Sequence, residues 1–293
     1  MKTETSLPLA APEPALARVP PQAWFLVSAV FHYLGPAFAV LLFAAVAPLG
    51  VAWLRIASAA AVFALWRRPW RYFRRLDRDA QRTVLALGVV LAVMNVCFYL
   101  AIARLPLGTV GAIEFLGPIL LAAIGMGSAR NLAALVLAAA GVFVLTDVRL
   151  AGAPLGFLFA FLNCALFLLY IVLGHRIAAD GGKAGIDRLG CAMMVAMVTA
   201  LPIGIRDAAP AFLHPDLLAA GIGVGICSSV IPYVCDQLAM AKLPRASFAL
   251  MLSLLPAMAC VIGVLVLRQI PSAWEIAGIG LVIAGVALHR QAG

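Results

Sequence analysis

Charged residues are scarce in this sequence of 293 residues: Asp, Glu, Lys and Arg together make up 11%, while 65% of the residues are hydrophobic. A soluble domain is about a quarter charged and about half apolar, so this chain has too little charge to cover a surface in water. The excess apolar surface has to face lipid, where only helices and closed barrels satisfy the backbone. The alternation of apolar and polar residues typical of barrel strands is absent. An all-α integral membrane protein is therefore expected.

Motifs for enzymatic chemistry are also missing. The sequence has no Walker A motif, which excludes ATP-driven pumping by this chain alone. The six cysteines lie inside apolar runs without CxxC spacing, so packing is expected rather than disulfides or zinc binding. The four histidines lie in unrelated segments, and no paired carboxylate motif is present. We therefore expect no catalytic residue, no metal and no cofactor.

The net charge of +9 could indicate nucleic-acid binding, but the basic residues cluster in short loops between apolar segments. That placement is typical of the orientation signal of membrane proteins. The longest basic run, 67–82, is interleaved with Trp70, Tyr72 and Phe73 and is expected to contact lipid head groups. The lipid bilayer is expected as a partner, and nucleic acid is not.

Ten apolar segments are long enough, or nearly so, to cross a hydrocarbon layer of roughly 30 Å. With the N-terminus inside, 16 Lys and Arg fall on the inner side and 4 on the outer side, which predicts cytoplasmic termini in a bacterial-type inner membrane. The first 23 residues hold five prolines and are expected to form a disordered cytoplasmic tail, not a signal peptide. The segments are 24–44, 49–66, 83–103, 107–126, 131–147, 154–174, 188–205, 216–239, 246–267 and 273–289.

An internal repeat divides the chain into two halves. Residues 103–118 read ARLPLGTVGAIEFLGP, and residues 241–256 read AKLPRASFALMLSLLP, at a constant offset of 138 that aligns both prolines. Because five spans is an odd number, the second copy must have the opposite topology. Such repeats are typical of secondary transporters, whose sites lie at the repeat interface. We predict two inverted five-helix repeats, 24–147 and 154–289.

Glu114 and Arg55 lie well inside apolar spans, where a charged residue is costly unless it is paired or hydrated. For Glu114 two interpretations are open: it faces a water-filled cavity and senses a substrate amine or a proton, or it forms a structural ion pair with Arg55. For Arg55 a structural role is favoured, because arginine rarely loses its charge.

Polar and aromatic residues share one face of the third, sixth and eighth spans at helical spacing. Such faces suit a ligand that is half polar and half apolar, although interhelical hydrogen bonds give the same pattern. Prolines in the fourth and ninth spans are either hinges or ordinary membrane prolines. Asp236 lies near the inner end of its span, where snorkelling is an alternative role. We predict Asn95, Tyr99, Glu114, Asn163, Tyr170 and Tyr233 as substrate-binding residues, and Arg55, Pro118, Asp236 and Pro256 as structural or coupling residues.

The segments 94–100 (MNVCFYL), 105–108 (LPLG) and 114–118 (EFLGP) resemble the threonine/homoserine exporter branch of the drug/metabolite transporter superfamily, of EamA type. The resemblance extends over 54–55, 170–176 and 232–233 and covers most of the chain. It implies ten helices, cytoplasmic termini and export of amino acids or related metabolites. The sequence departs from the family pattern at Leu255, where an acid is usual, at Arg268–Gln269 in place of Gly-Glu, and at Phe167 in place of tryptophan.

The sequence thus predicts a secondary transporter that exports a small amphipathic metabolite, such as an amino acid, by alternating access. Because Leu255 replaces an acid, a substrate more apolar than threonine is expected, with weak dependence on a proton gradient unless Glu114 titrates. An integral membrane enzyme acting on a lipid and a non-transporting assembly subunit are the alternatives. A small-molecule substrate is the expected partner, and both a monomer and a homodimer are compatible with the sequence.

Overall fold

The computed structural model describes residues 19–117, 129–149, 153–179, 181–243, 251 and 254–288, and every regular element in these ranges is a helix. Six stretches are long and apolar enough to cross a membrane. They are α1 (Pro21–Leu42), α2 (Pro48–Arg67), α4 (Arg78–Ile102), α8 (Pro154–Ala178), α9 (Gly182–Leu213) and the continuous run of α10 (Pro215–Gly225), η2 (Ile226–Val230) and α11 (Ile231–Met240).

Shorter helices complete the described part of the chain. The apolar stretches in α7 (Ala129–Arg149), α13 (Leu254–Leu267) and α14 (Ala273–Leu288) are shorter than those of the six long helices. The remaining elements are α5 (Leu107–Glu114) and the five-residue helix α3 (Pro69–Phe73). The long apolar helices and short connections are those of a multi-pass membrane protein.

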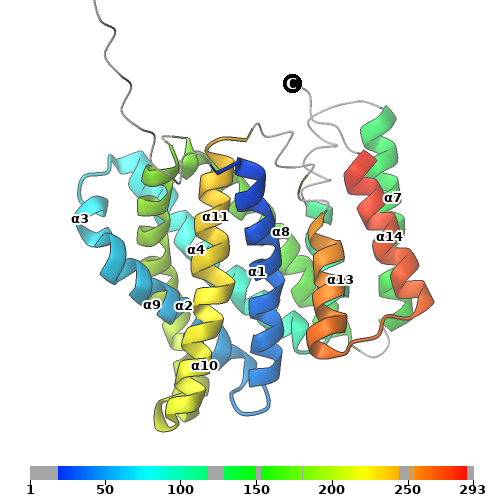
Figure 1. The fold of residues 1–293 in the computed structure, drawn as a ribbon, viewed down its shortest axis with the longest axis horizontal. Helices are drawn as coiled ribbons and strands as arrows, with labels where there is room; N and C mark the ends of the chain where they lie inside the picture. The colour runs from blue at the N-terminus through cyan, green and yellow to red at the C-terminus, as the bar shows by residue number, and fades with distance from the viewer. Residues whose placement is uncertain are drawn as a thin grey trace, which may run out of the picture.

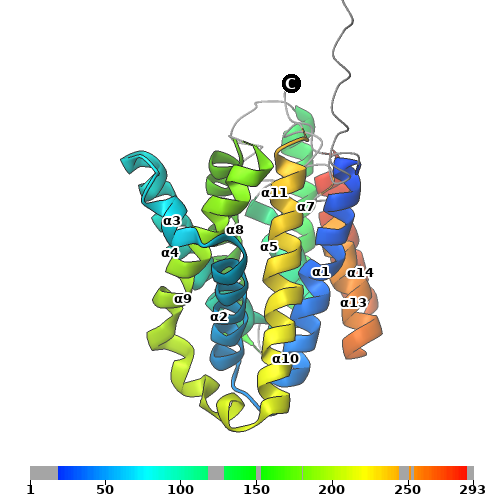
Figure 2. The same cartoon turned by 60° about the vertical axis from the view of Figure 1, so that its left-hand side comes forward.

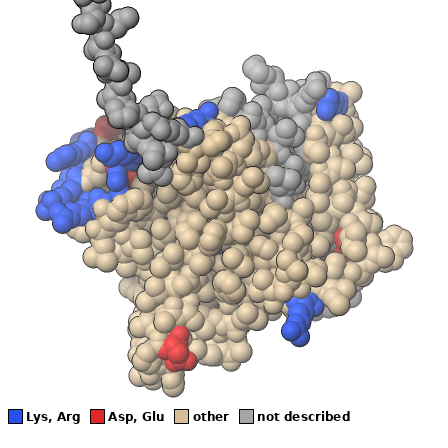
Figure 3. Space-filling model, viewed as in Figure 1, with Lys and Arg blue, Asp and Glu red and all other residues tan. Residues whose placement is uncertain are grey.

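The helices form one bundle in which sequence-distant elements lie side by side. Figures 1 and 2 show α7 against α14 at one edge, and α2 with α9 at the other, with α1, α8 and α11 between them. The short helix α3 follows α2 at one end of the bundle, where Lys and Arg gather (Figure 3). Trp66 and Trp70 are half exposed there, as expected for residues at a membrane interface.

Most predicted spans agree with the observed helices to within a few residues, but the fourth and seventh do not, and the predicted start of the ninth, at 246, lies outside the described residues. The fourth, predicted over 107–126, is interrupted: α5 ends at Glu114, a turn follows at Phe115, and residues 116–117 are helical again. The sequence gives a reason for a break at this point, because the proline at position 118 has no N–H to donate to the carbonyl four residues earlier, which is that of Glu114. The seventh span, predicted over 188–205, belongs to a much longer helix, α9.

Polar residues misled the boundary prediction for α9. Its first turns contain Asp187, which forms a 2.6 Å ion pair with Arg67 of α2, so charge there pairs across two helices instead of ending one. Two prolines lie within α9 and do not end it. The predicted tail also ends earlier than expected, because α1 begins at Pro21. Residues 1–18, residues 118–128 with Pro118, and residues 244–250 lie outside the described residues.

Glycine allows α1 to lie directly against η2. A Cβ atom added to Gly35 would overlap the Ser228 Oγ atom and lie 2.7 Å from the Ser228 backbone nitrogen. Small residues permit this close approach of helices in membranes, where packing rather than hydrophobicity drives association. The contact places the backbone of η2 against the centre of α1, next to the polar residues described below.

Replacing Gly35 with alanine should therefore destabilise the protein by about 1–3 kcal/mol, because the backbone of η2 has to move. Thermal unfolding of the purified protein in detergent measures the effect. Gly280 of α14 is the matched control, because a Cβ atom there meets nothing within 4 Å. Gly280→Ala should be neutral, or stabilise by up to about 1 kcal/mol through helix propensity. Equal behaviour of the two variants would contradict the close contact.

Candidate functional site

Arg55 lies in the middle of α2 with only 4% of its surface exposed, and neutral groups hold it. Its Nε donates to the Ser229 hydroxyl at 2.8 Å, and its Nη2 donates to the Ser228 carbonyl at 2.7 Å and to the Tyr233 hydroxyl at 3.3 Å. The remaining nitrogen, Nη1, takes part in none of these bonds. The guanidinium carbon also lies 5.5 Å from the centre of the Tyr99 ring, within cation–π range.

The irregular helix opposite Arg55 explains why a backbone carbonyl is available to it. Residues 226–230 form a π-helical turn, and Pro232 follows directly after it. Proline has no N–H, so it cannot bond the carbonyl four residues earlier, which is that of Ser228. Arg55 donates to that carbonyl instead. Single π turns of this kind occur often at functional sites.

Glu114 is the last residue of α5 and is 2% exposed. Its Oε1 accepts a hydrogen bond of 2.9 Å from the Asn163 amide of α8, and its Oε2 accepts one of 3.2 Å from the Tyr33 hydroxyl of α1. Both donors are neutral. The carboxylate therefore lies between three helices with its hydrogen bonds made but no cation bonded to it.

Asp236 is buried in the same region and does not snorkel to the interface. It is 7% exposed, and its two oxygens accept hydrogen bonds from the Ser28 hydroxyl of α1 at 2.5 Å and the Tyr170 hydroxyl of α8 at 3.3 Å. The burial contradicts the snorkelling interpretation. A second carboxylate thus lies inside the bundle, again held by neutral donors.

The ion-pair interpretation of Glu114 is also not observed. Among the described residues, the two ion pairs within 4.0 Å are Arg67–Asp187 and Arg82–Asp79, and neither involves Arg55, Glu114 or Asp236. Arg55, Glu114 and Asp236 are therefore buried in one region without neutralising one another by contact. An unpaired charge in a low-dielectric interior is expensive, which marks the region as a candidate ligand site.

Aromatic rings connect the three charged groups. Ring centres are separated by 5.5 Å between Tyr170 and Tyr233, by 5.8 Å between Phe167 and Tyr170, and by 5.7 Å between Phe115 and Phe167. Such pairs are stabilising beyond the area they bury, by about 0.5–1.5 kcal/mol. The aromatic residues form an apolar wall beside the polar groups, as in sites for amphipathic ligands.

Nearly all of the predicted site residues that the structure describes lie in one central cluster. Asn95 is buried one turn from Tyr99, donates to the Leu91 carbonyl of its own helix at 2.7 Å, and also interacts with the Tyr233 side chain. Pro256, by contrast, lies in the first turn of α13, which is described from Leu254. Its backbone is not among the hydrogen-bond partners of Arg55, Glu114 and Asp236 given above.

Sequence reasoning missed two partners of this cluster. Ser28 was not singled out, because one serine in an apolar helix carries no local signal. The Ser228 carbonyl was missed although the neighbouring Pro232 could have indicated a freed backbone group. Three buried polar atoms in the cluster make no hydrogen bond of good geometry with a described residue: Oδ1 of Asn163 and the hydroxyls of Tyr99 and Ser228, although these two hydroxyls lie close enough to interact with each other. Buried polar groups normally have partners, so these atoms favour a ligand or water in the cluster.

Little space is open inside the cluster in this conformation. A pocket of about 10 Å³, the space of about one water molecule, lies at Asp236. Its lining residues are Ser28, His32, Phe167, Tyr170, Ile171, Asp236, Met240 and Leu255.

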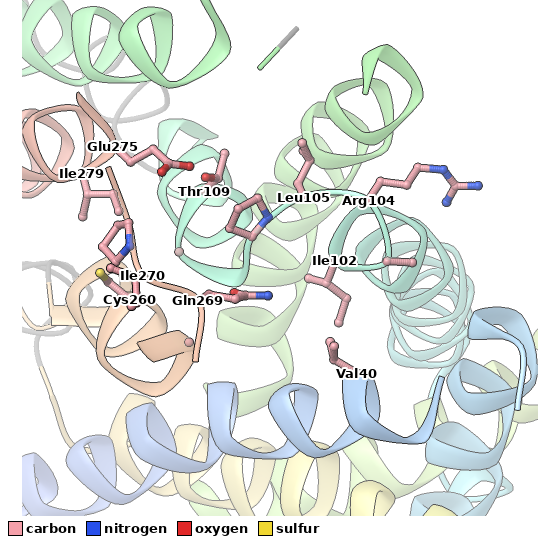
Figure 4. Close-up of a pocket in the computed structure, with 15 residues that line it drawn as sticks. Val40, Ile102, Arg104, Leu105, Thr109, Cys260, Gln269, Ile270, Glu275 and Ile279 are labelled. Atoms are coloured by element: carbon pink, nitrogen blue, oxygen red, sulfur yellow. The ribbon is translucent and has the colours of Figure 1, made fainter. Parts of the chain in front are cut away.

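A larger cavity of about 400 Å³ lies elsewhere, between the start of α5 and the linker from α13 to α14, and none of the predicted site residues lines it. Glu275 and Thr109 point toward each other in it, while Arg104 points away (Figure 4). Glu275 accepts from the Ser272 backbone N–H at 2.8 Å as part of a capping box. Gln269 accepts from the Leu107 backbone N–H at 3.0 Å, joining the linker to α5.

Comparison with known proteins places this geometry in a family. The EamA-like transporter family matches residues 154–290. The threonine/homoserine exporter RhtA of Escherichia coli (strain K12) is 30% identical over 257 residues, which cover 85% of this chain and 84% of that protein. The chain belongs to the EamA-like transporter family. The RhtA exporter of Salmonella typhimurium (strain SL1344) matches with the same identity and coverage.

The fold is also found in a solved structure. A protein of known crystal structure covers 91% of this chain and 96% of its own, with a TM-score of 0.58 and 19% identity. That similarity concerns the fold alone. The family relatives are exporters and not enzymes, in agreement with a membrane exporter that acts on a small molecule.

The hydrogen bonds of Arg55 predict that lysine cannot replace it. A single ammonium cannot reproduce the planar set of donors to Ser229, Ser228 and Tyr233, so Arg55→Lys should lower the free energy of unfolding by about 1–3 kcal/mol. Thermal unfolding in detergent tests this. Arg104→Lys is the control, because Arg104 is exposed and donates to the Leu100 carbonyl of its own helix. An unchanged unfolding temperature for Arg55→Lys would show that these bonds do not hold α2 to η2 and α11.

Proposed function

We propose that this protein exports small zwitterionic amino acids through the central cluster by alternating access. The observation that supports this most is the separation of charge: Arg55 and Glu114 are both buried, and neutral acceptors hold Arg55 while neutral donors hold Glu114, instead of the two pairing with each other. A zwitterion carries one charge of each sign and needs a partner for each in a low-dielectric interior. The similarity to threonine/homoserine exporters supports the same substrate class.

The arrangement of donors and acceptors suggests how such a substrate binds. Glu114 accepts the ammonium group, displacing or sharing the hydrogen bonds from Tyr33 and Asn163. The carboxylate is bound on the other side by Nη1 of Arg55 and by the Tyr99 hydroxyl, which lies next to the Arg55 and Ser228 side chains. A bidentate or charge-assisted contact from arginine is well suited to a carboxylate.

The side chain of the substrate is proposed to lie against the aromatic wall. Phe167 and Leu255 both line the pocket at Asp236, and both replace more polar residues of the family pattern. An apolar surface at this point favours an apolar substrate side chain over the hydroxyl of threonine, because burying an unpaired hydroxyl is costly. We therefore expect a preference for amino acids more apolar than threonine.

The transport cycle is proposed to rest on ten helices in two inverted repeats, residues 24–147 and 154–289. The matched range of the family, 154–290, nearly coincides with the second repeat. Helix contacts also occur in corresponding sets, as expected from such symmetry: α4 packs on α8 as α11 packs on α1, and α4 packs on α9 as α10 packs on α2. The closed centre and the larger cavity near one end are compatible with one state of an alternating-access cycle.

The orientation is proposed from the distribution of charge. Lys and Arg gather at the end of the bundle that carries α3 and are sparse at the opposite end (Figure 3). The excess of basic residues marks the cytoplasmic side, which puts both termini in the cytoplasm and the 400 Å³ cavity toward the outside. The membrane is proposed to be the inner membrane of a bacterial-type cell.

Glu114→Gln should abolish transport of radiolabelled leucine and threonine into inside-out vesicles, because the amide keeps the shape but loses the charge that binds the ammonium group. The transport rate should fall by about tenfold or more, which corresponds to at least about 1.4 kcal/mol of lost binding free energy. Glu275→Gln is the matched control, because glutamine also completes a capping box and Glu275 lies outside the central cluster. Transport that survives in Glu114→Gln and fails in Glu275→Gln would refute the assignment.

Substrate preference gives a separate test. Cells that overexpress the protein should tolerate apolar amino acids such as leucine better than they tolerate homoserine and threonine. Leu255→Glu should reverse that order, since a carboxylate at the pocket provides a partner for a polar substrate. Growth at graded concentrations of each amino acid measures both effects. Tolerance confined to homoserine and threonine in the unmodified protein would overturn the preference for apolar substrates.

A further inference from the structure

The two buried carboxylates share the same two supporting helices. Helix α1 donates to Asp236 through Ser28 and to Glu114 through Tyr33. Helix α8 donates to Glu114 through Asn163 and to Asp236 through Tyr170. The carboxylates themselves come from α5 and α11 and are 122 positions apart in the sequence.

The spacing of these donors orders the carboxylates along the bundle. The donors are five residues apart on α1 and seven apart on α8, which corresponds to a rise of about 7–11 Å along a helix axis. Asp236 is bonded nearer the N-terminus of α1 and nearer the C-terminus of α8, so both helices place it toward the same end of the bundle. That is the end proposed as cytoplasmic. The small pocket lies at the level of Asp236, because its lining includes Asp236 with both of its donors, Ser28 and Tyr170, but neither donor of Glu114.

The surroundings of Asp236 leave no role for it as an ion-pair partner. No Lys or Arg lies within 4.0 Å of it among the described residues. In this conformation its pocket has room for about one water molecule. The groups that face Asp236 or its pocket are Ser28 and His32 from α1, Tyr170 from α8 and Leu255 from α13. Tyr233 and Cys235 lie beside it on α11, and Arg55 of α2 lies beyond Tyr233. From α9, Gly185 lies against Gln237, the residue that follows Asp236.

We propose that Asp236 is the proton-carrying residue of the transport cycle, separate from Glu114, which binds the substrate. The inference rests on the proposed export function and adds its coupling ion. One proton binds the Asp236 carboxylate while the site faces outside, and it is released to the cytoplasm when the site faces inward. One amino acid moves outward in the same cycle, with its ammonium group at Glu114. Proton and substrate therefore occupy different carboxylates at two levels of one path along α1 and α8.

This assignment replaces the weak proton dependence expected from the sequence, which counted Glu114 as the titratable group of the site. A carboxylate inside a membrane bundle with neutral donors and space for about one water molecule can bind a proton without binding substrate. The hydroxyl groups of Ser28 and Tyr170 rotate, so each can donate to the carboxylate or accept from the carboxylic acid.

Purified protein reconstituted in liposomes separates coupling from binding. Exchange is measured with unlabelled amino acid inside, labelled leucine or threonine outside and equal pH on both sides. Coupled transport is measured as accumulation of the same label driven by an acidic interior. Asp236→Asn should keep exchange within about twofold and lose coupled accumulation by about tenfold or more, because the amide binds no proton. Glu114→Gln should lose both activities.

Two further variants serve as controls for this experiment. Asp216→Asn changes an exposed carboxylate in the first turn of α10 and should alter neither activity. Asp236→Glu keeps a titratable group and should retain coupled accumulation, with a shifted pH dependence, which makes the proposal testable even if Asp236→Asn does not fold.

The outcomes are distinct. Equal loss of exchange and accumulation in folded Asp236→Asn would make Asp236 a structural or substrate-binding residue, and full retention of accumulation would also overturn the proposal. Exchange without any response to the pH gradient in the unmodified protein would refute proton coupling. An unmodified protein that neither exchanges nor accumulates leucine or threonine would refute the proposed export function itself.

Discussion

Placing a permanent cation inside a membrane bundle is the constraint on which the rest of the interior depends. Arg55 cannot neutralise itself, so the chain has to provide acceptors around it. It does so with a serine hydroxyl, a tyrosine hydroxyl and a backbone carbonyl from the irregular stretch between α10 and α11. The π turn and Pro232 are thus part of one arrangement, in which an imperfect helix supplies what the buried arginine needs. Because neutral groups hold Arg55, neither Glu114 nor Asp236 is paired with it.

Helices α1 and α8 both donate hydrogen bonds to the buried carboxylates. Each of these helices contacts both carboxylates, so a displacement of either one changes the hydrogen bonds at Glu114 and at Asp236 together. Coupling between two sites requires an element whose position both sites influence. In this bundle α1 and α8 meet that requirement by direct contact, and no longer chain of intermediates is needed.

Much of the fold followed from the sequence because lipid-facing helices have a strong and local signal. Apolar length predicted the positions of helices such as α1, α2 and α8 to within a few residues. The signal failed where polar residues belong to a helix, as in the first turns of α9, because pairing of Asp187 with Arg67 depends on a partner 120 positions away.

The same distinction explains what was found of the central cluster. Helical spacing selected Asn163, Tyr170 and Tyr233, because side chains on one face can be identified within a single segment. It did not select Ser28, whose importance comes only from Asp236, 208 residues later. It also left Asp236 ambiguous, because depth inside a bundle depends on how helices pack and not on distance from a span end. Contacts between distant segments, not the types of residues, were the missing information.

The pairing of α7 with α14 has a consequence for how the protein is made. A Cβ atom on Gly141 would lie 2.5 Å from the Gly278 carbonyl oxygen, and one on Gly285 would lie 2.7 Å from that of Ala134, so the two helices touch backbone to backbone. Helix α14 is the last described element of the chain, and more than 120 residues separate it from α7. Because α7 is synthesised long before α14, its small-residue face has no α14 to pack against during most of synthesis. Completion of this edge of the bundle is therefore a late event in folding, and a chain truncated before α14 would leave the small-residue face of α7 without its partner.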